Sequence, residues 1–334
     1  MKAKLIAQLK SWEFILLILV VVTLVLAAAV VPGFTQPFSI STALATFAPA
    51  ALMALPMALL VIVRDIDISV ASIAGLSSVA GGLAIQAGQS LPVVIIVALL
   101  AGVLCGAING FFVALLGLPA LLVTLGTLAL FRGLCYVLLG GTPISPVPDF
   151  FAALGNNNIP GLIVPWAIVP FLVLSVVFAV VLHRGTVGRR IYAIGGNPDT
   201  AHYSGIHVTR IRFVLFTISG VVAALAGLIN IGITSQIAPD GALGVELDVI
   251  TVAFLGGVSV LGGKGRITGV FLASVLIMTL RKSLQLENVS GYTQGIAVGG
   301  VLILSLLVTN LFQQLIGSVR NRRKSALGSG PSPA

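Results

Sequence analysis

Long apolar runs follow one another along most of the chain, separated by short stretches with charge, glycine or proline. A membrane-spanning helix needs about 20 predominantly apolar residues, and the pattern predicts about ten such helices. Two of the runs, 247–262 and 267–280, are short for a crossing, so nine or eleven crossings remain open. The predicted spans are 14–31, 43–63, 67–87, 92–116, 118–139, 162–182, 213–233, 247–262, 267–280 and 294–313.

The composition agrees with a membrane protein built of helices. Of the 334 residues, 58% are hydrophobic and 8% are charged, against about 45–50% apolar and about 25% charged in soluble domains. The 38 glycines suit helices that pack closely in lipid. We therefore predict an all-α polytopic membrane helix bundle and exclude a water-soluble fold. Cys105 and Cys135 lie in apolar stretches without a spacing pattern, so no disulfide framework is expected.

The basic residues gather on one side of the predicted membrane. With the N-terminus in the cytoplasm, ten crossings place fifteen of the 18 Lys and Arg residues in cytoplasmic segments, as the positive-inside rule expects. The net charge of +9 is therefore a topology signal, and we expect no nucleic-acid partner. We predict a cytoplasmic N-terminus over 1–13, a transmembrane domain over 14–320 and a cytoplasmic, disordered tail over 321–334, so that both termini are cytoplasmic.

An internal repeat is indicated by two similar acidic segments. Asp65-Ile66-Asp67-Ile68 resembles Glu246-Leu247-Asp248-Val249, 181 residues later. This match places the third predicted span opposite the eighth and suggests two halves of five spans each. Because five is odd, the halves would have opposite orientations in the membrane, as in inverted-repeat transporters.

Two glycine stripes have the four-residue spacing that lets helices approach closely. Each stripe predicts either packing within the chain or a contact between subunits. The stripes are Gly102, Gly106 and Gly110 in one span and Gly291, Gly295 and Gly299 at the start of the last.

Polar residues in or beside the spans are candidates for a translocation path, because such groups are costly in a membrane unless they are solvated, paired or functional. The acidic residues lie at predicted span starts, so capping of helix N-termini is the alternative. Asp65 can pair with the neighbouring Arg64. Arg132 either extends to the headgroups or lines a polar path, and Asn109 and Asn230 either bond neighbouring helices or donate to a hydroxylated substrate. The candidate path residues are Asp67, Ser69, Asn109, Arg132, Glu246 and Asp248.

The connection 183–212, predicted to be cytoplasmic, contains the signals of a short helix. Asn197 is a good N-cap, Pro198 fits the first helical position, and Gly205 suits a left-handed C-terminus. A helix this short is not stable alone, so it must be held by its own loop or by a partner. It either docks on a partner or rests on the bilayer. The three histidines of this connection lack the spacing of a metal site, and no metal site is predicted.

Several blocks in this order resemble the membrane permeases of bacterial ATP-driven carbohydrate importers, the group for ribose, rhamnose, galactofuranose and autoinducer-2. The blocks are Ile66-Asp67-Ile68-Ser69-Val70, Ala107-Ile108-Asn109-Gly110, Thr124-Leu125-Gly126-Thr127, Phe131-Arg132-Gly133, Tyr192-Ala193-Ile194-Gly195-Gly196-Asn197-Pro198, Ser204-Gly205-Ile206, Gly256-Gly257-Val258-Ser259 and Gly262-Gly263.

The resemblance implies a multi-pass subunit of the bacterial inner membrane that has no catalytic chemistry and no cofactor of its own. ATP would be bound by a cytoplasmic ATPase subunit, and a periplasmic sugar-binding protein would deliver the substrate. A second copy of the permease or a sister permease would complete the assembly in the lipid bilayer. The residues implied to couple to the ATPase are Asn197, Pro198, Asp199, Thr200, Ala201, His202, Tyr203, Ser204 and Gly205.

The substrate is less closely defined than the family. Arg64 and Asp65 stand where the commoner pattern has Gly-Gly, and Thr200, His202 and Tyr203 also depart from it. The segments 69–72 and 128–133 are most similar to rhamnose-type permeases, with an autoinducer-2 or another pentose or hexose permease as the alternative. An ion-coupled secondary transporter is the second alternative, although all the acidic pairs fall at span ends rather than deep within a span.

Overall fold

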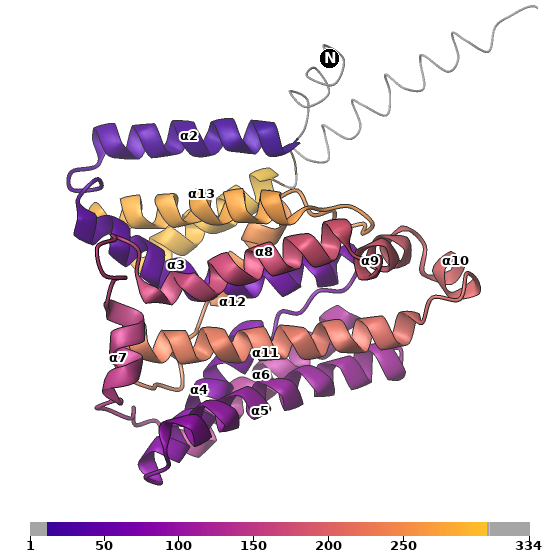
Figure 1. Ribbon diagram of the computed structural model, residues 1–334, viewed down its shortest axis with the longest axis horizontal. Coiled ribbons are helices and arrows are strands. Elements are labelled where there is room, and N and C mark those ends of the chain that lie inside the picture. Colours follow the sequence, from indigo (N-terminus) through magenta and orange to yellow (C-terminus); the bar gives the residue numbers. More distant parts are fainter. Residues whose placement is uncertain (1–11, 306, 308–334) are drawn as a thin grey trace, which may run out of the picture.

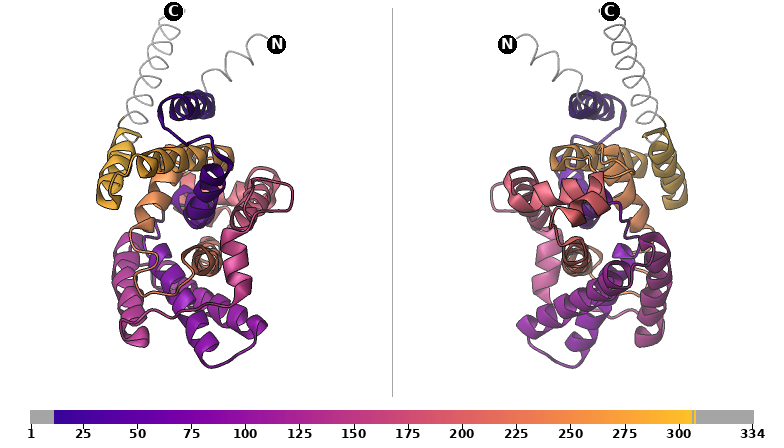
Figure 2. Two further views of the ribbon diagram at one scale, coloured as in Figure 1. Left: turned by 90° about the vertical axis from the view of Figure 1, so that its left-hand side faces the viewer. Right: turned by 90° about the vertical axis from the view of Figure 1, so that its right-hand side faces the viewer.

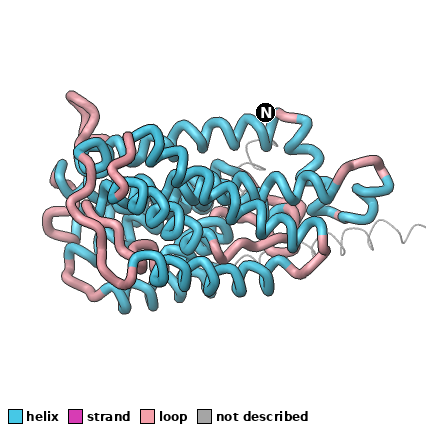
Figure 3. Tube along the Cα trace, turned by 90° about the horizontal axis from the view of Figure 1, so that it is seen from below, coloured by secondary structure: helices cyan, strands magenta, loops and turns pink. Residues whose placement is uncertain are grey.

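The computed structural model describes residues 12–305 and 307, and this part of the chain is helical without strands. Figure 1 shows the helices lying side by side, and Figure 3 shows most loops gathered at the two ends of the bundle. The helices are α2 (Trp12–Val30), α3 (Pro37–Ile62), α4 (Val70–Gln86), α5 (Leu91–Gly110) with its π-helical extension η1 (Phe111–Leu115), α6 (Ala120–Leu139), α7 (Asp149–Asn156), η2 (Trp166–Ile168), α8 (Val169–Arg184), α9 (Thr186–Gly196), α10 (Pro198–Tyr203), α11 (Val208–Thr234), α12 (Val245–Leu255), α13 (Ile267–Leu286) and Gly291–Ser305.

The hydropathy prediction of about ten membrane helices is confirmed. Within the described residues, seven helices are long and apolar enough to cross a membrane, and α4 and Gly291–Ser305 are shorter apolar helices. Together with α12 they match the ten predicted spans in order. The largest difference is α12, which ends at Leu255 instead of 262, because Gly256 and Gly257 begin a loop with a left-handed glycine. The short helix α7 was not predicted.

Two long helices, α3 and α11, form the centre of the bundle. They pack on each other, and α11 also packs on α4 and α5 while α3 packs on α12 and α13. Figures 1 and 2 show two layers: α2, α3, α8 and α13 in one, and α4, α5, α6 and α11 in the other. Helix α11 thus packs on the helices that follow α3 in the chain, and α3 packs on the helices that follow α11. Almost all of α3 is buried as a result.

The order of elements supports the predicted five-plus-five inverted repeat. In each half a long helix (α3 or α11) is followed by a break, a shorter helix (α4 or α12) and a further long helix (α5 or α13). The residue offset of 181 does not describe the elements, since Pro37 and Val208, Val70 and Val245, and Leu91 and Ile267 are 171, 175 and 176 residues apart. Asp65 therefore precedes α4, whereas Glu246 lies inside the first turn of α12.

The two glycine stripes have different surroundings. A Cβ atom at Gly102 or Gly106 of α5 would collide with backbone atoms of α11, including the carbonyl oxygens of Gly220 and Phe216. This stripe therefore serves packing within the chain, one of its two predicted uses. Around Gly291, Gly295 and Gly299, a Cβ would meet nothing within 4 Å in the described part of the chain.

Candidate functional site

The short helix predicted in the connection 183–212 is present as α10. The Asn197 side chain accepts a hydrogen bond from the Thr200 amide (3.0 Å), Pro198 is the first helical residue, and Gly205 has a φ of +80°. Ala201 is buried, whereas Tyr203 is 89% exposed. The packing of α10 is on α9 and α11, its neighbours in sequence, and Figure 1 shows it projecting from one end of the bundle.

Just before α10 in the chain, the C-terminal end of α9 packs directly on the C-terminal end of α3. Gly195 leaves no room for a Cβ, which would collide with the Ile62 carbonyl oxygen and the Gly263 amide nitrogen. The Gly263 amide donates to that same Ile62 carbonyl (2.9 Å). Arg64, with a left-handed φ of +72°, donates from Nε to the Gly195 carbonyl (2.8 Å) and from Nη2 to the Gly196 carbonyl (2.6 Å). Three separate segments of the chain are thus joined here through backbone atoms.

The possible pairing of Asp65 with Arg64 is not formed. Asp65 instead accepts two hydrogen bonds from Arg212 of α11, at 2.7 and 2.6 Å, and its side chain is 3% exposed. Arg64 is engaged by the carbonyl groups at the end of α9, which leaves Asp65 to the guanidinium of α11. The planar, two-point contact is the strong form of such a pair.

Three of the predicted path residues meet in a buried network just before α4. Asp67 accepts hydrogen bonds from the Ser69 amide (3.0 Å), the Ser69 hydroxyl (2.6 Å) and the Ser219 hydroxyl of α11 (3.1 Å). Asn109 of α5 donates to the Ser69 hydroxyl (2.7 Å), so its predicted role between helices is confirmed. Asp67, Ser69 and Asn109 are each fully buried. Ser219 and Thr124, which donates to the Ile66 carbonyl (3.1 Å), were not predicted.

The other three predicted path residues belong to the second half. Glu246 and Asp248 lie in the first turn of α12, as the capping interpretation predicted. Asp248 accepts hydrogen bonds from Arg281 of α13 at 2.9 and 2.7 Å, and Glu246 forms an ion pair with Arg132 of α6 at 3.6 Å. Arg132 therefore has a protein partner that neither interpretation of its sequence position had named.

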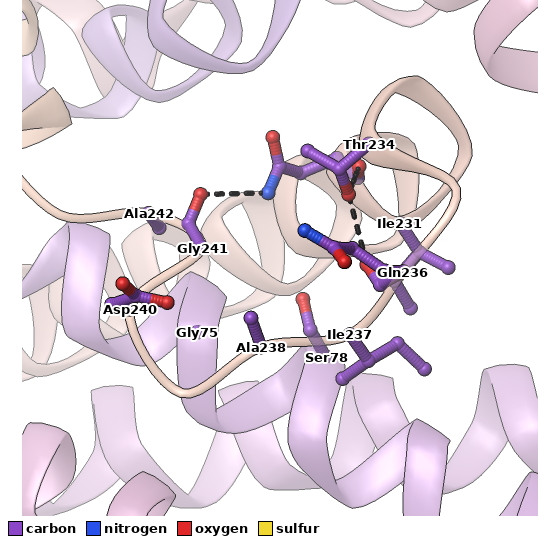
Figure 4. A pocket seen from close by; sticks show the side chains of 11 residues that line it. Gly75, Ser78, Ile231, Thr234, Gln236, Ile237, Ala238, Asp240, Gly241 and Ala242 are labelled. Carbon is purple, nitrogen blue, oxygen red and sulfur yellow. Dashed lines mark hydrogen bonds between the residues drawn. The ribbon is translucent and has the colours of Figure 1, made fainter. Parts of the chain in front are cut away.

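Two polar cavities lie beside the break between α11 and α12. The first, about 230 Å³, is bounded by α4, the end of α11 and the following loop, and Figure 4 shows Ser78, Thr234, Gln236 and Asp240 around it. The second, about 280 Å³, lies between α3, α11, α12 and α13 and is lined by Asp248, Arg281, Lys282, Gln285 and others. Asn230 lines both cavities and donates to the Gly241 carbonyl (2.9 Å).

Most basic residues of the described chain lie at the end of the bundle that carries α10. The Tyr192 hydroxyl of α9 donates to the Gly265 carbonyl there (2.6 Å). Burial raises the pKa of Tyr192, against the opposing effect of the Arg266 guanidinium, so the hydroxyl keeps its proton. The basic residues of this end are Arg64, Arg184, Arg189, Arg190, Arg210, Arg212, Lys264 and Arg266. The predicted cytoplasmic charges at 2, 4, 10, 320 and 322–324, and most of the proposed terminal segments, lie outside the described residues.

Residues 39–307 match the protein family described as the permease component of the branched-chain amino acid transport system. The chain belongs to this permease family. It is therefore a transport component rather than an enzyme.

Several curated relatives of this permease are similar over almost their whole length. The ribose import permease protein RbsC of Haemophilus influenzae is 34% identical, with 88% of this chain and 91% of the relative covered. The autoinducer 2 import system permease protein LsrD of an Enterobacter species is 32% identical, with 90% and 93% covered. LsrC of Escherichia coli O157:H7 is 34% identical, with 93% and 92% covered. The resemblance to the ribose and autoinducer-2 group of permeases is confirmed.

A solved structure, the inward-facing conformation of a metal-chelate type ABC transporter, shares the fold. It superimposes with a TM-score of 0.50 at 18% identity, over 92% of this chain and 98% of that one. At this identity the likeness concerns the fold alone, and it agrees with the all-α membrane bundle.

Proposed function

We propose that this permease is the membrane subunit of an ATP-binding-cassette importer that moves a small neutral sugar into the cytoplasm. The observation that carries the proposal is α10, a capped helix held outside the bundle by its two neighbours in sequence. A surface helix of this kind, anchored at both ends, is suited to receive the movement of a cytoplasmic ATPase. Relatives named as import permeases for ribose and autoinducer-2 support the transport class.

The end with α9 and α10 is the cytoplasmic end in this proposal, and both termini lie on that side. The gathering of basic residues around α10 supports this orientation by the positive-inside rule. The opposite end, with α7 and the two polar cavities, then faces the periplasm, where a sugar-binding protein would dock.

The favoured substrate is a rhamnose-like sugar, with autoinducer-2 or another pentose or hexose as the alternative. The similarity of segments 69–72 and 128–133 to rhamnose-type permeases favours the first. Asn230, Thr234 and Gln236 offer neutral donors and acceptors beside the cavities, which suits a hydroxyl-rich molecule. Direct uptake assays with each sugar distinguish the candidates.

A second permease subunit, either a copy of this chain or a sister, completes the proposed assembly. No described residue lies within 4 Å of a Cβ placed at Gly291, Gly295 or Gly299, which supports the use of this stripe as a contact between subunits. Exposed leucines along α6, such as Leu122 and Leu130, offer further apolar surface for a partner or for lipid.

Affinity purification of the tagged permease from mildly crosslinked native membranes tests the proposal. Mass spectrometry is expected to find a P-loop ATPase and a sugar-binding protein with the wild type. Gly205→Val should reduce recovery of the ATPase severalfold, since a β-branched residue is strained at φ +80° and distorts the end of α10. Gly88→Val is the matched control, because Gly88 has a φ of +68° and open surroundings at the opposite end.

Two results would contradict the proposal. Reproducible absence of an ATPase from the wild type would favour an ion-coupled carrier. Equal ATPase recovery and equal uptake in wild type and Gly205→Val would remove α10 as the coupling element.

A further inference from the structure

Two consecutive residues in the break after α3 hold the chain on both sides of α10. Arg64 donates two hydrogen bonds to the carbonyls of Gly195 and Gly196, which immediately precede the N-cap of α10. Asp65 accepts two hydrogen bonds from Arg212, the fifth residue of α11, which follows α10.

We propose that Arg64 and Asp65 are positioning residues that transmit displacement of α10 to α4 and hence to the polar cavity beside it. The inference rests on the proposed importer function and adds a mechanical link that the coupling helix alone does not supply. It makes Arg64 and Asp65 functional residues of this permease.

The backbone explains how neighbouring residues reach different partners. The left-handed φ of +72° at Arg64 is costly for a residue with a side chain, and it aims the guanidinium at the end of α9. The charge lies where the carbonyl groups of a helix C-terminus attract a cation. Asp65 is aimed the other way, into the bundle, where it is almost fully buried against Arg212. Because the two residues share one peptide bond, α9 and α11 are tied to the same point.

From that point the connection to α4 is short and is held by several hydrogen bonds. The Ile66 carbonyl accepts from Thr124 of α6, and Asp67 binds Ser69 and Ser219. Ser69 is the N-cap residue of α4. Ser78, nine residues later on the same helix, lines the first cavity. At 1.5 Å per residue this is roughly 13 Å along a rigid helix.

The basic residue Arg210 provides a matched control for Arg212. It lies two residues earlier in α11, is exposed, and has no ion pair among residues 12–305. Replacing Arg210 by Gln changes the charge near α10 as much as replacing Arg212 by Gln. It leaves intact the hydrogen bonds that Arg64 and Asp65 make to the segments on either side of α10.

The test measures substrate imported per ATP hydrolysed by the importer reconstituted in lipid vesicles with its ATPase and binding protein. We expect Arg64→Gly, Asp65→Asn and Arg212→Gln to keep the ATPase bound but to lower this ratio about fivefold or more, a typical coupling effect. Arg64→Gly also relieves the left-handed strain, so loss of folding is not its expected effect. Arg210→Gln should stay within about twofold of the wild type. Unchanged ratios in both Arg64→Gly and Asp65→Asn would overturn the inference.

A second measurement uses the permease alone and stays informative if no ATPase binds the wild type. Gly205→Val distorts α10, and hydrogen exchange reports its effect on the amides of Val70–Ala74 in α4. If Arg64 and Asp65 transmit the change, exchange in α4 should shift severalfold in the wild-type background and remain unshifted in an Arg64→Gly, Asp65→Asn background. Equal shifts in both backgrounds would overturn the inference, whereas absence of the ATPase by itself would overturn the importer assignment only.

Discussion

The two breaks that interrupt the bundle, 63–69 after α3 and 235–244 after α11, occupy similar places in the two halves but differ in what surrounds them. At the first break, Asp65 and Asp67 are buried against side chains of α11 and of the break itself. At the second break, Asn230 lines two cavities, and Asp240 lines one of them.

This difference indicates that the two breaks have different roles in the structure. The side chains of Asp65, Asp67 and Ser69 at the first break are hydrogen-bonded within the protein, so they fix the relative positions of helices. Polar groups beside the second break border open volume, so they are placed to contact water or a solute. Two halves with the same order of elements thus differ in what they place at their breaks: a hydrogen-bonded junction at the first and polar cavities at the second.

The largest expected effect tests the rigidity of the first break. Gly195→Leu forces a side chain against backbone atoms of Ile62 and Gly263, and we expect it to destabilise the permease by about 3 kcal/mol or more. Gly196→Leu is the control, because a Cβ there meets nothing within 4 Å. Thermal unfolding of the detergent-purified proteins measures the difference. Equal melting temperatures would show that the junction is loosely packed.

The next effect concerns the ion pair beside the second break. Arg281→Ala leaves the buried Asp248 carboxylate without its partner, and we expect a loss of about 2 kcal/mol, reduced from the value for a fully buried pair because Arg281 is partly exposed. Adding Asp248→Asn should recover at least half of the loss, since the uncompensated charge is then gone. If the second substitution brings no recovery in the same unfolding assay, Arg281 acts through packing instead.

The smallest effects on stability are expected for two asparagines, one beside each break. Asn109 bonds Ser69 of the first break, and Asn230 bonds Gly241 of the second. Asn109→Ala removes the bond to Ser69 in a fully buried site, and we expect a loss of about 1–2 kcal/mol in unfolding with KM for uptake unchanged. Asn230→Ala should cost less than about 1 kcal/mol but raise KM, because this side chain borders both cavities. A raised KM for Asn109→Ala together with an unchanged KM for Asn230→Ala would contradict the roles assigned to the two breaks.

The sequence predicted those features that depend on local rules. Hydropathy located the helices, because each span must satisfy its backbone hydrogen bonds within itself. The capping residues Asn197, Pro198 and Gly205 located α10, because a cap is formed by residues adjacent in sequence.

Features that depend on distant residues were not accessible in this way. Asp65 and Arg212 are separated by 147 positions, and the nearer Arg64 offered an equally plausible partner until the backbone turn at Arg64 was known. Ser219 carries no signal in sequence beyond being a serine in an apolar run. The cavities around Asn230 arise from the packing of four helices and a loop, which hydropathy does not specify.

The attachment of α10 has a consequence for evolution. Because α10 packs mainly on α9 and α11 within the described residues, the outward-facing residues Thr200, His202 and Tyr203 can be exchanged with little effect on the stability of the bundle. In the proposed importer, substitutions at these positions would change recognition of the ATPase without changing the packing of the interior. If α10 is the coupling element proposed above, gene duplication followed by divergence at these three positions would produce permeases that share one architecture yet bind different ATPases.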